Sequence, residues 1–151
     1  MATSQQPQYP QPAVTVCFAV KIDDDELGSF NSCEGLGVEV VLEQREEGGN
    51  NGFVWQLPTR IKYSNVKLSR PICNDTSAVM SWLSEMTTGV TVRTAHISAM
   101  AAEGSVVATW SLYGVIPVRW TGPSLNLDSP KVAMETLELA HHGFLPKGAT
   151  Q

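Results

Sequence analysis

The side chains best suited to acid–base or metal chemistry are three histidines and two carboxylates. The histidines are His96, His141 and His142, and the nearest carboxylates to the last two are Glu135 and Glu138. Neighbouring residues of a β-strand point to opposite faces, so His141 and His142 cannot easily bind one metal ion. Glu135 and Glu138 are expected on opposite faces as well. These side chains form no convergent set, so we expect no metal site and no catalytic site here.

Four other motifs have structural interpretations. The acidic run "DDDELG" at 23–28 is expected to form a turn, because its glycine comes too late for a calcium loop. "GLG" at 35–37 lacks the third glycine of a dinucleotide-binding fingerprint, and the glycosylation sequon at 74–76 is interpreted as a helix start. An odd number of cysteines without CxxC spacing indicates buried free thiols: Cys17, Cys33 and Cys73. No cofactor is predicted.

The composition is that of one globular domain. The 151 residues are 42% hydrophobic and 17% charged, which is enough to bury a core without disulfides or a metal. The net charge is −5 and no cluster of Lys and Arg occurs, so we expect neither sequence-specific nucleic-acid binding nor attraction to an anionic membrane. No segment has the roughly 20 apolar residues of a membrane anchor. Residues 1–13 lack the features of a secretory signal, which favours assembly in the cytoplasm.

Seven segments alternate apolar and polar residues with the period of two that is typical of β-strands. The last segment also suits a helix by composition, but its alternation favours a strand. Pro58 is predicted to close the third segment, Pro71 to stop the fourth, and Pro117 to mark a bend, an edge or a break in the sixth. The segments are residues 14–22, 36–47, 53–57, 61–70, 91–101, 106–120 and 131–142.

One segment, residues 75–89, has helical spacing instead. Asn74 or Asp75 can cap its first turn, and Gly89 suits its C-terminal end. Its apolar residues recur at the i, i+3, i+4, i+7 spacing of one stripe, which predicts a helix that packs one face on a sheet. The stripe consists of Val79, Trp82, Leu83 and Met86.

Residues 43–58 predict a long β-hairpin whose tip is too polar for a core. Asn51-Gly52 is a strong hairpin-turn signal, and the turn follows a charged run. The predicted fold class is therefore mainly β: two packed antiparallel sheets, sandwich-like or barrel-like, with one flanking α-helix and a long β-hairpin arm. Residues 14–145 form the domain, 1–13 a Gln- and Pro-rich disordered tail, and 146–151 a flexible tail.

An ordered series of motifs resembles the tail-tube protein family of contractile phages and contractile injection systems. The motifs run as "FAVKIDDDELGSFNSCEGLGVEV", "REEGGNNGFVWQLP", "IKYSNVKLSR", "DTSAVMSWL" and "PVRWTGPSLNLDSPKVAMETLELAHHGF", over about residues 14–145. The last motif is the most specific. The chain departs from the family at Pro71-Ile72, where a glycine is frequent, and in its tail at 1–13.

The resemblance implies a non-enzymatic structural subunit that closes into hexameric rings, which stack into a hollow inner tube. It implies as partners a contractile sheath, baseplate, spike and tube-initiator proteins, and a cargo of protein effector or phage DNA in the lumen. The particle is then released or delivered outside the cell. The residues expected where rings meet are those of the arm tip: Arg45, Glu46, Glu47, Gly48, Gly49, Asn50, Asn51, Gly52 and Phe53.

Two alternatives stay open on the sequence. A baseplate-proximal tube initiator shares the fold, although the compact length favours the repeating subunit. A monomeric small-molecule-binding β-barrel belongs to a different class and would require a hydrophobic cavity; an enzyme ranks third. The sequence does not separate a phage from an injection system.

Overall fold

The computed structural model describes residues 14–49, 52–128 and 130–146; the tail at 1–13 and all but the first residue of the tail at 146–151 lie outside them. Over these residues the fold is mainly β with one helix, as predicted. In chain order the elements are β1 (Thr15–Ile22), β2 (Asp25–Phe30), β3 (Ser32–Glu34), β4 (Val38–Glu46), β5 (Val54–Tyr63), β6 (Val66–Pro71), α1 (Thr76–Glu85), β7 (Arg93–Ala101), β8 (Val106–Thr121), β9 (Met134–Ala140) and β10 (Gly143–Phe144).

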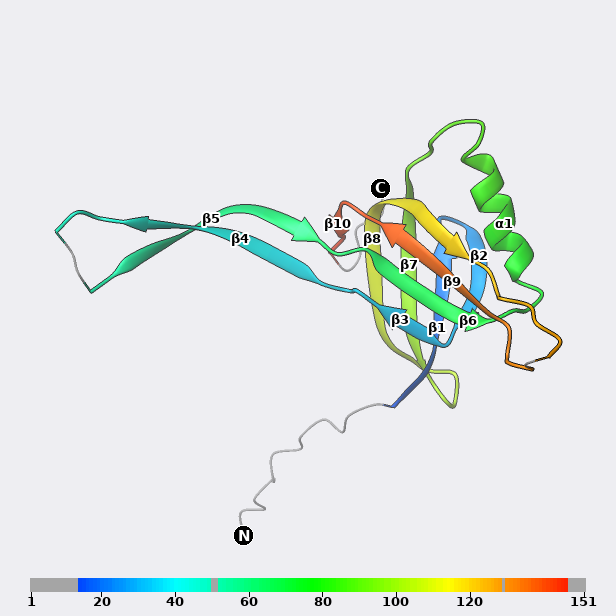
Figure 1. Cartoon of the computed structure of the whole chain (residues 1–151). Coiled ribbons are helices and arrows are strands. Elements are labelled where there is room, and N and C mark those ends of the chain that lie inside the picture. Colours follow the sequence, from blue (N-terminus) through cyan, green and yellow to red (C-terminus); the bar gives the residue numbers. More distant parts are fainter. Residues whose placement is uncertain (1–13, 50–51, 129, 147–151) are drawn as a thin grey trace, which may run out of the picture.

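The body of the protein consists of two packed antiparallel layers that share β8 (Figure 1). The strands follow one another in the order β2-β1-β7-β8-β9-β6-β3, and β10 also pairs with β8. The first part of β8 pairs with β7 and its last part with β9, so this 16-residue strand passes from one layer to the other. Its pairing with β9 is irregular between Pro117 and Arg119, where the sequence predicted a bend or break. The sheet is not closed into a barrel, because β2 and β3 remain its two ends.

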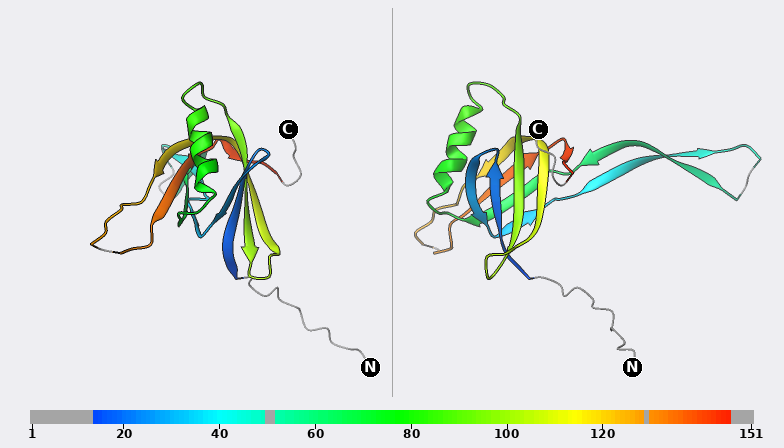
Figure 2. Two further views of the ribbon diagram at one scale, coloured as in Figure 1. Left: turned by 90° about the vertical axis from the view of Figure 1, so that its right-hand side faces the viewer. Right: turned by 180° about the vertical axis from the view of Figure 1, so that it is seen from behind.

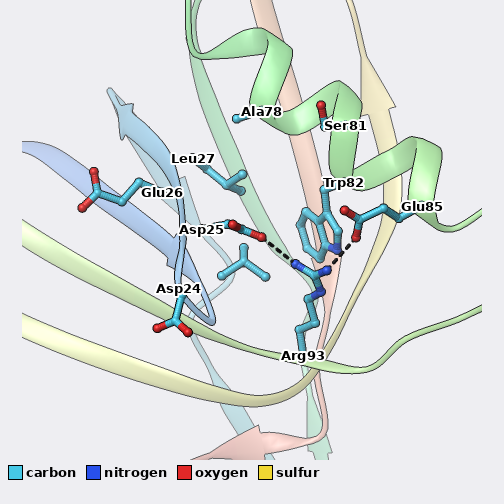
Figure 3. A pocket seen from close by; sticks show the side chains of 10 residues that line it. Asp24, Asp25, Glu26, Leu27, Ala78, Ser81, Trp82, Glu85 and Arg93 are labelled. Carbon is cyan, nitrogen blue, oxygen red and sulfur yellow. Dashed lines mark hydrogen bonds and ion pairs between the residues drawn. The ribbon is translucent and has the colours of Figure 1, made fainter.

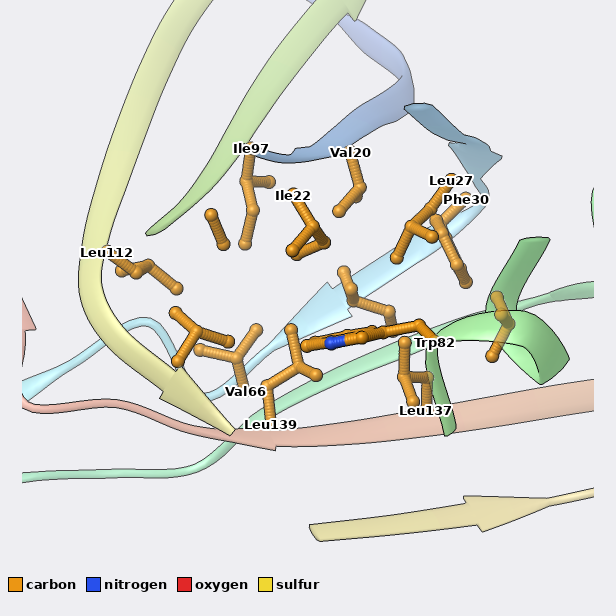
Figure 4. Close-up of a cluster of buried hydrophobic side chains, with 14 residues drawn as sticks. Val20, Ile22, Leu27, Phe30, Val66, Trp82, Ile97, Leu112, Leu137 and Leu139 are labelled. Atoms are coloured by element: carbon orange, nitrogen blue, oxygen red, sulfur yellow. The ribbon is translucent and has the colours of Figure 1, made fainter. Parts of the chain in front are cut away.

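The core lies between the two layers and is filled by alternate side chains of their strands (Figure 4). Helix α1 closes one side of the core, and Val79 and Trp82 of its predicted stripe are buried. Each large apolar side chain that is fully buried contributes about 1.5–3 kcal/mol to stability. The buried apolar residues are Val20, Ile22, Leu27, Phe30, Val66, Leu68, Val79, Trp82, Ala95, Ile97, Leu112, Val115, Leu137 and Leu139.

The prediction that Pro58 closes a strand is wrong. Strand β5 continues through Pro58 to Tyr63, and the chain breaks instead at Ser64-Asn65 before β6. The hairpin tolerates the proline because a β-bulge lies there: Leu42 is opposite Pro58, whereas Val41 is opposite Arg60. The extra residue, Thr59, donates its side-chain hydroxyl to the carbonyl of Val41 at 2.8 Å.

Three local predictions need correction. The turn after β1 uses only the start of the acidic run, because β2 begins at Asp25. Helix α1 ends at Glu85 and not near Gly89, and the side chain of Asp75 at its N-cap makes no capping hydrogen bond. The thiols are free, but Cys73 is exposed and Cys17 and Cys33 are only half-buried; burial raises the pKa of Cys33 to about 11.

Candidate functional site: an arm and two open sheet edges

Strands β4 and β5 form a separate two-stranded arm that projects from the body (Figures 1 and 2). Their register pairs Val38 with Tyr63 at the root and Glu46 with Val54 near the tip. Almost every residue of both strands is exposed, which is unusual because an isolated two-stranded hairpin is marginally stable in water. The arm therefore has no core of its own to cover.

The half of the arm nearest the body has one apolar face. Residues opposite one another in the ladder share a face, so Val40 and Ile61 lie together, with Val38 and Leu42 beside them. Each of these four side chains is about half exposed. The opposite face there bears the charged pair Glu39 and Lys62. An apolar strip on an exposed arm is typical of a surface that contacts another molecule.

The predicted interface residues lie at the tip of the arm. Arg45 and Glu46 end β4, residues 47–49 enter the turn, Gly52 and Phe53 lead into β5, and Asn50 and Asn51 lie outside the described residues. Arg45 forms an exposed ion pair with Glu43 at 3.2 Å, which contributes at most about 1 kcal/mol.

Beside the tip lies an aromatic pair, of which Phe53 but not Trp55 was among the predicted interface residues. The rings of Phe53 and Trp55 meet edge to face, with their centroids 4.7 Å apart, and Trp55 lies opposite Arg45 in the ladder. Both aromatic side chains are almost half exposed. Exposed Trp and Arg are the residue types most enriched among interface hot spots. The alternation of side chains in "FVWQL" places both rings on one face of the strand, and this pattern could have revealed the pair from the sequence.

The root of the arm is held firmly by the body. The chain enters the arm at Gly35, whose φ is +87° and which packs against the carbonyl oxygen of Asn65 where the chain returns. His141 donates from Nε2 to the carbonyl of Ser64 at 3.1 Å. The rings of Tyr63, His141 and Phe144 pack together, with centroids 5.2–6.0 Å apart. The arm's root therefore has a fixed position on the body.

The layer β2-β1-β7-β8 has two open edges. Strand β2 ends the sheet. β8 pairs with β10 only at Leu112 and Tyr113, and Leu145 N–H donates to the carbonyl of Ser111, so the edge before Ser111 has no described partner. A groove of about 650 Å³ runs along that edge between β8 and the chain after β10. Unpaired edges are ready to accept strands of another chain. The groove is lined by Val106, Val107, Ala108, Thr109, Trp110, Ser111, Phe144 and Leu145.

Glu135, considered as an acid–base group, is instead part of a buried ion pair. Its carboxylate accepts from Arg70 Nε at 2.6 Å, Thr76 Oγ1 at 2.9 Å and Trp120 Nε1 at 3.0 Å. Burial alone would raise the pKa of Glu135, but the hydrogen bonds from Arg70, Trp120 and Thr76 outweigh it and hold the pKa below its usual value. Arg70 also donates to the carbonyl of Leu27. The pair thus joins β6, β9, β8, α1 and β2.

Two of the histidines, His141 and His142, contact backbone carbonyls, and His96 contacts the Ser111 hydroxyl. His142 Nδ1 lies 2.8 Å from the carbonyl of Gly114, and His141 is engaged at the arm root. Within the described ranges, no group of three or more His, Cys, Asp or Glu side chains is placed to hold a metal ion. In the same part of the chain, no helix is long and apolar enough to cross a membrane.

Comparison with known families settles what this architecture belongs to. Residues 14–145 match the family described as T4-like virus tail tube protein gp19. The chain belongs to this family. The protein is therefore a tail tube protein, a structural tube subunit, and a ligand-binding barrel is the wrong alternative.

Solved structures share the fold at low sequence identity. A chain of the anti-feeding prophage cap, described as the AFP tube terminating cap, has a TM-score of 0.78 at 22% identity, covering 96% of this chain and 97% of that chain. A chain of an extracellular contractile injection system, the PVC sheath-tube complex in its extended state, has 0.76 at 20%, covering 89% and 90%. A type six secretion system protein has 0.57 at 10%, covering 83% and 79%. No curated protein sequence matches the tail tube protein.

Proposed function

We propose that this tail tube protein is the repeating subunit of the inner tube of a contractile tail or injection system. Copies close into hexameric rings, and the rings stack into a tube that sheath contraction drives into a target. The observation that carries the proposal is the pair of open edges at opposite ends of the β2-β1-β7-β8 layer. A contact between two different edges of identical subunits is heterologous, and such contacts form a ring when the rotation closes.

Strand direction supports edge-to-edge pairing between copies. β1 is antiparallel to both β2 and β7, and β7 is antiparallel to β8, so β2 and β8 run in opposite directions. A neighbour's β2 placed against β8 then continues the antiparallel alternation without interruption. The apolar groove along β8 supplies side-chain contacts to such a strand.

The face of this layer that points away from the core suits a passage. It carries hydroxyl groups in the contacting pairs Ser98–Thr109 at 3.2 Å and His96–Ser111 at 2.8 Å, and one opposed charged pair, Lys21 and Glu26. In a closed ring this face lines the lumen, where an effector protein or DNA travels. Short hydroxyl side chains offer a cargo few strong contacts.

The arm connects rings in this proposal. Its root is fixed on the body, whereas its tip and its apolar strip are exposed, so they are free to contact another ring. The interface residues are those predicted from the sequence, Arg45 to Phe53, together with Trp55. A long exposed hairpin without a core of its own gains stability only from such a partner.

We propose further partners by analogy with the structural relatives. One relative comes from a sheath-tube complex and another from an anti-feeding prophage baseplate, which supports a contractile sheath and baseplate proteins as neighbours. The role is structural rather than catalytic. Assembly takes place in the cytoplasm, and the finished particle acts outside the cell.

The test blocks the β8 edge with charge. Val106→Lys and Val107→Lys together place two ammonium groups in the groove, a device that natural sheets use to prevent edge pairing. We expect a folded monomer by analytical ultracentrifugation and circular dichroism, and no rings in electron micrographs. The matched control is Val90→Lys with Val92→Lys, two exposed valines outside the edge, which should leave the rings intact. Rings from the edge variant at wild-type yield would refute the proposal.

A further inference from the structure

The chain after β10 follows the same β8 edge that ring closure requires. Phe144 lies opposite Leu112, and the next residue, Leu145, donates its backbone N–H to the carbonyl of Ser111 at 2.8 Å. Because the two segments are antiparallel, each further residue of the chain moves one position toward the start of β8. The ladder therefore leads from β10 into the part of the edge that has no partner among the described residues.

The groove of about 650 Å³ lies in the path of this segment, since it is lined by β8 and by the first residues after its pairing with β10. If the register continues, Lys147 falls opposite Thr109 and Ala149 opposite Val107. An extended chain advances about 3.3 Å per residue. Residues 147–151 are therefore long enough to follow the edge to the start of β8.

The position of the proline in this segment suits a strand in the same register. Along an antiparallel pair, residues that exchange hydrogen bonds alternate with residues that do not. Leu145 donates to β8, so the N–H groups of residues 147 and 149 would point toward β8 and that of residue 146 away from it. Pro146 therefore costs the ladder no hydrogen bond, whereas Lys147 and Ala149 keep their donors.

We propose that residues 147–151 pair with β8 at residues 106–109 in the free subunit, and so occupy the edge that a neighbour's β2 takes in the ring. The segment is a removable cover of this edge, and a subunit enters a ring only when the segment leaves. An uncovered edge accepts strands from any chain, so the cover keeps free subunits from wrong pairings. The docking itself needs no ring, but its effect on assembly rests on the proposed function.

A neighbour's β2 can displace the segment because β2 is already ordered. Arg93 holds the start of β2 against the helix: Nη1 lies 2.9 Å from Asp25 of β2, and Nη2 lies 2.6 Å from Glu85 of α1 (Figure 3). Residues 147–151 instead give up backbone entropy when they pair, which offsets much of what their few hydrogen bonds contribute.

Protein concentration then decides which strand occupies the edge. The segment belongs to the same chain as β8, so its pairing is intramolecular and does not depend on concentration. Pairing with a neighbour's β2 is an association and becomes more favourable as the concentration rises. The cover therefore sets the concentration at which rings begin to form.

The experiment compares two variants of the full-length protein that carry the same number of added prolines. Lys147→Pro with Ala149→Pro removes the two N–H groups that face β8. The matched control is Gly148→Pro with Thr150→Pro, which removes two N–H groups that face away from β8. Each variant differs from wild type only in backbone donors and side chains of the segment, so the core remains unchanged.

The first measurement is amide hydrogen exchange by NMR at a concentration below ring formation. After correction for intrinsic rates, exchange in wild type should be about tenfold slower at Lys147 and Ala149 than at Gly148 and Thr150. Thr109, whose N–H faces the segment, should be protected in wild type and in the control. Its exchange should be about tenfold faster in the Lys147→Pro/Ala149→Pro variant.

The second measurement is the concentration at which rings appear in electron micrographs. The Lys147→Pro/Ala149→Pro variant should form rings at about a tenfold lower concentration than wild type, and the control at the wild-type concentration.

Four results would overturn the proposal. They are fast exchange at Lys147, Ala149 and Thr109 in wild type, equal loss of protection in the control, an unchanged ring concentration in the first variant, and protection of Thr109 that grows with protein concentration. The last result would assign the edge to a second copy. If none of the three proteins formed rings, the proposed function would fail, while the exchange rates would still decide whether the segment docks.

Discussion

At the scale of single residues, the Arg70–Glu135 pair determines how the helix, β2 and the second layer are joined. Both side chains are only 1% exposed and lie 2.6 Å apart, and Arg70 also stacks over the Phe30 ring at 4.2 Å. A buried ion pair contributes little more to stability than an apolar pair of the same shape. Removal of one partner, however, leaves the other charge buried without a counter-charge. Arg70 Nη2 already lacks a partner, so the site has no spare acceptor.

Glu135→Gln should therefore lower the free energy of unfolding by about 3 kcal/mol at neutral pH. The folded-state pKa of Glu135 lies below its unfolded value of about 4.3, so the carboxylate contributes stability above that pH and loses it as pH falls through the folded pKa. The difference between wild type and variant should hence shrink below about pH 4. Urea unfolding at several pH values measures it. Glu138→Gln, on the exposed face of β9, is the control and should cost under about 1 kcal/mol; equal costs would contradict the assignment.

Gly35 shows how one residue positions the whole arm. Its positive φ disfavours any other residue, and an added Cβ would overlap the carbonyl oxygen of Asn65. Gly35→Ala should lower the free energy of unfolding by about 2 kcal/mol or more. Gly37→Ala is a close control, because its Cβ would meet only the Ser64 hydroxyl at 3.8 Å. Thermal unfolding measures the loss of stability in both variants. An equally small loss in both would show that the backbone at the arm root can rearrange to accept a Cβ at position 35.

At the scale of elements, the arm tip should matter for assembly and not for folding. Phe53→Ala with Trp55→Ala removes the aromatic pair from a hairpin that has no core of its own. We expect rings to form but stacked tubes to shorten or disappear in electron micrographs, while the free energy of unfolding changes by under about 1 kcal/mol. Leu125→Ala with Leu127→Ala, two exposed leucines in the β8–β9 loop, should leave the tubes unchanged. Tubes of normal length in the aromatic variant would show that the arm tip is not part of the interface between rings.

The elements also show how far a sequence alone can lead. Alternation predicted β1, β7, β8 and β9 because each has one buried and one more exposed face. It predicted β4 from an apolar face that is exposed on the arm, and the turn chemistry predicted the hairpin. The short strands β3 and β10 have no pattern of their own, since they exist only because β6 and β8 offer them an edge. Pro58 misled the prediction because a bulge and the Thr59 hydroxyl accommodate it.

The candidate sites depended on contacts between distant residues. Arg70 and Glu135 are 65 positions apart, and neither has a local pattern that reveals the other. The acidic run at 23–28 was visible, but its meeting with Glu85 and Trp82 depends on how α1 packs. The turn of the arm could be predicted from Asn51-Gly52, whereas its role in assembly came from the resemblance.

At the scale of the whole molecule, the two proposed contacts act in different directions and should fail separately. Edge pairing extends the β2-β1-β7-β8 layer sideways, and the arm reaches beyond the body. In a closed ring both edges of every subunit are paired, so edge pairing alone produces a ring and nothing larger. A contact that repeats along the axis produces a filament instead. The proposed order of assembly is therefore monomer, ring and tube.

Wild-type protein should form hexameric rings first and stacked tubes as its concentration rises, since each step is an association governed by mass action. Mass measurement in solution and electron microscopy across a concentration series follow both steps. The edge variant Val106→Lys/Val107→Lys should stop at the monomer, and Phe53→Ala/Trp55→Ala at the ring. A wild-type protein that stops at a single ring would instead indicate the tube initiator, because only a repeating subunit polymerises by itself. A monomer at every concentration would contradict the tube role altogether.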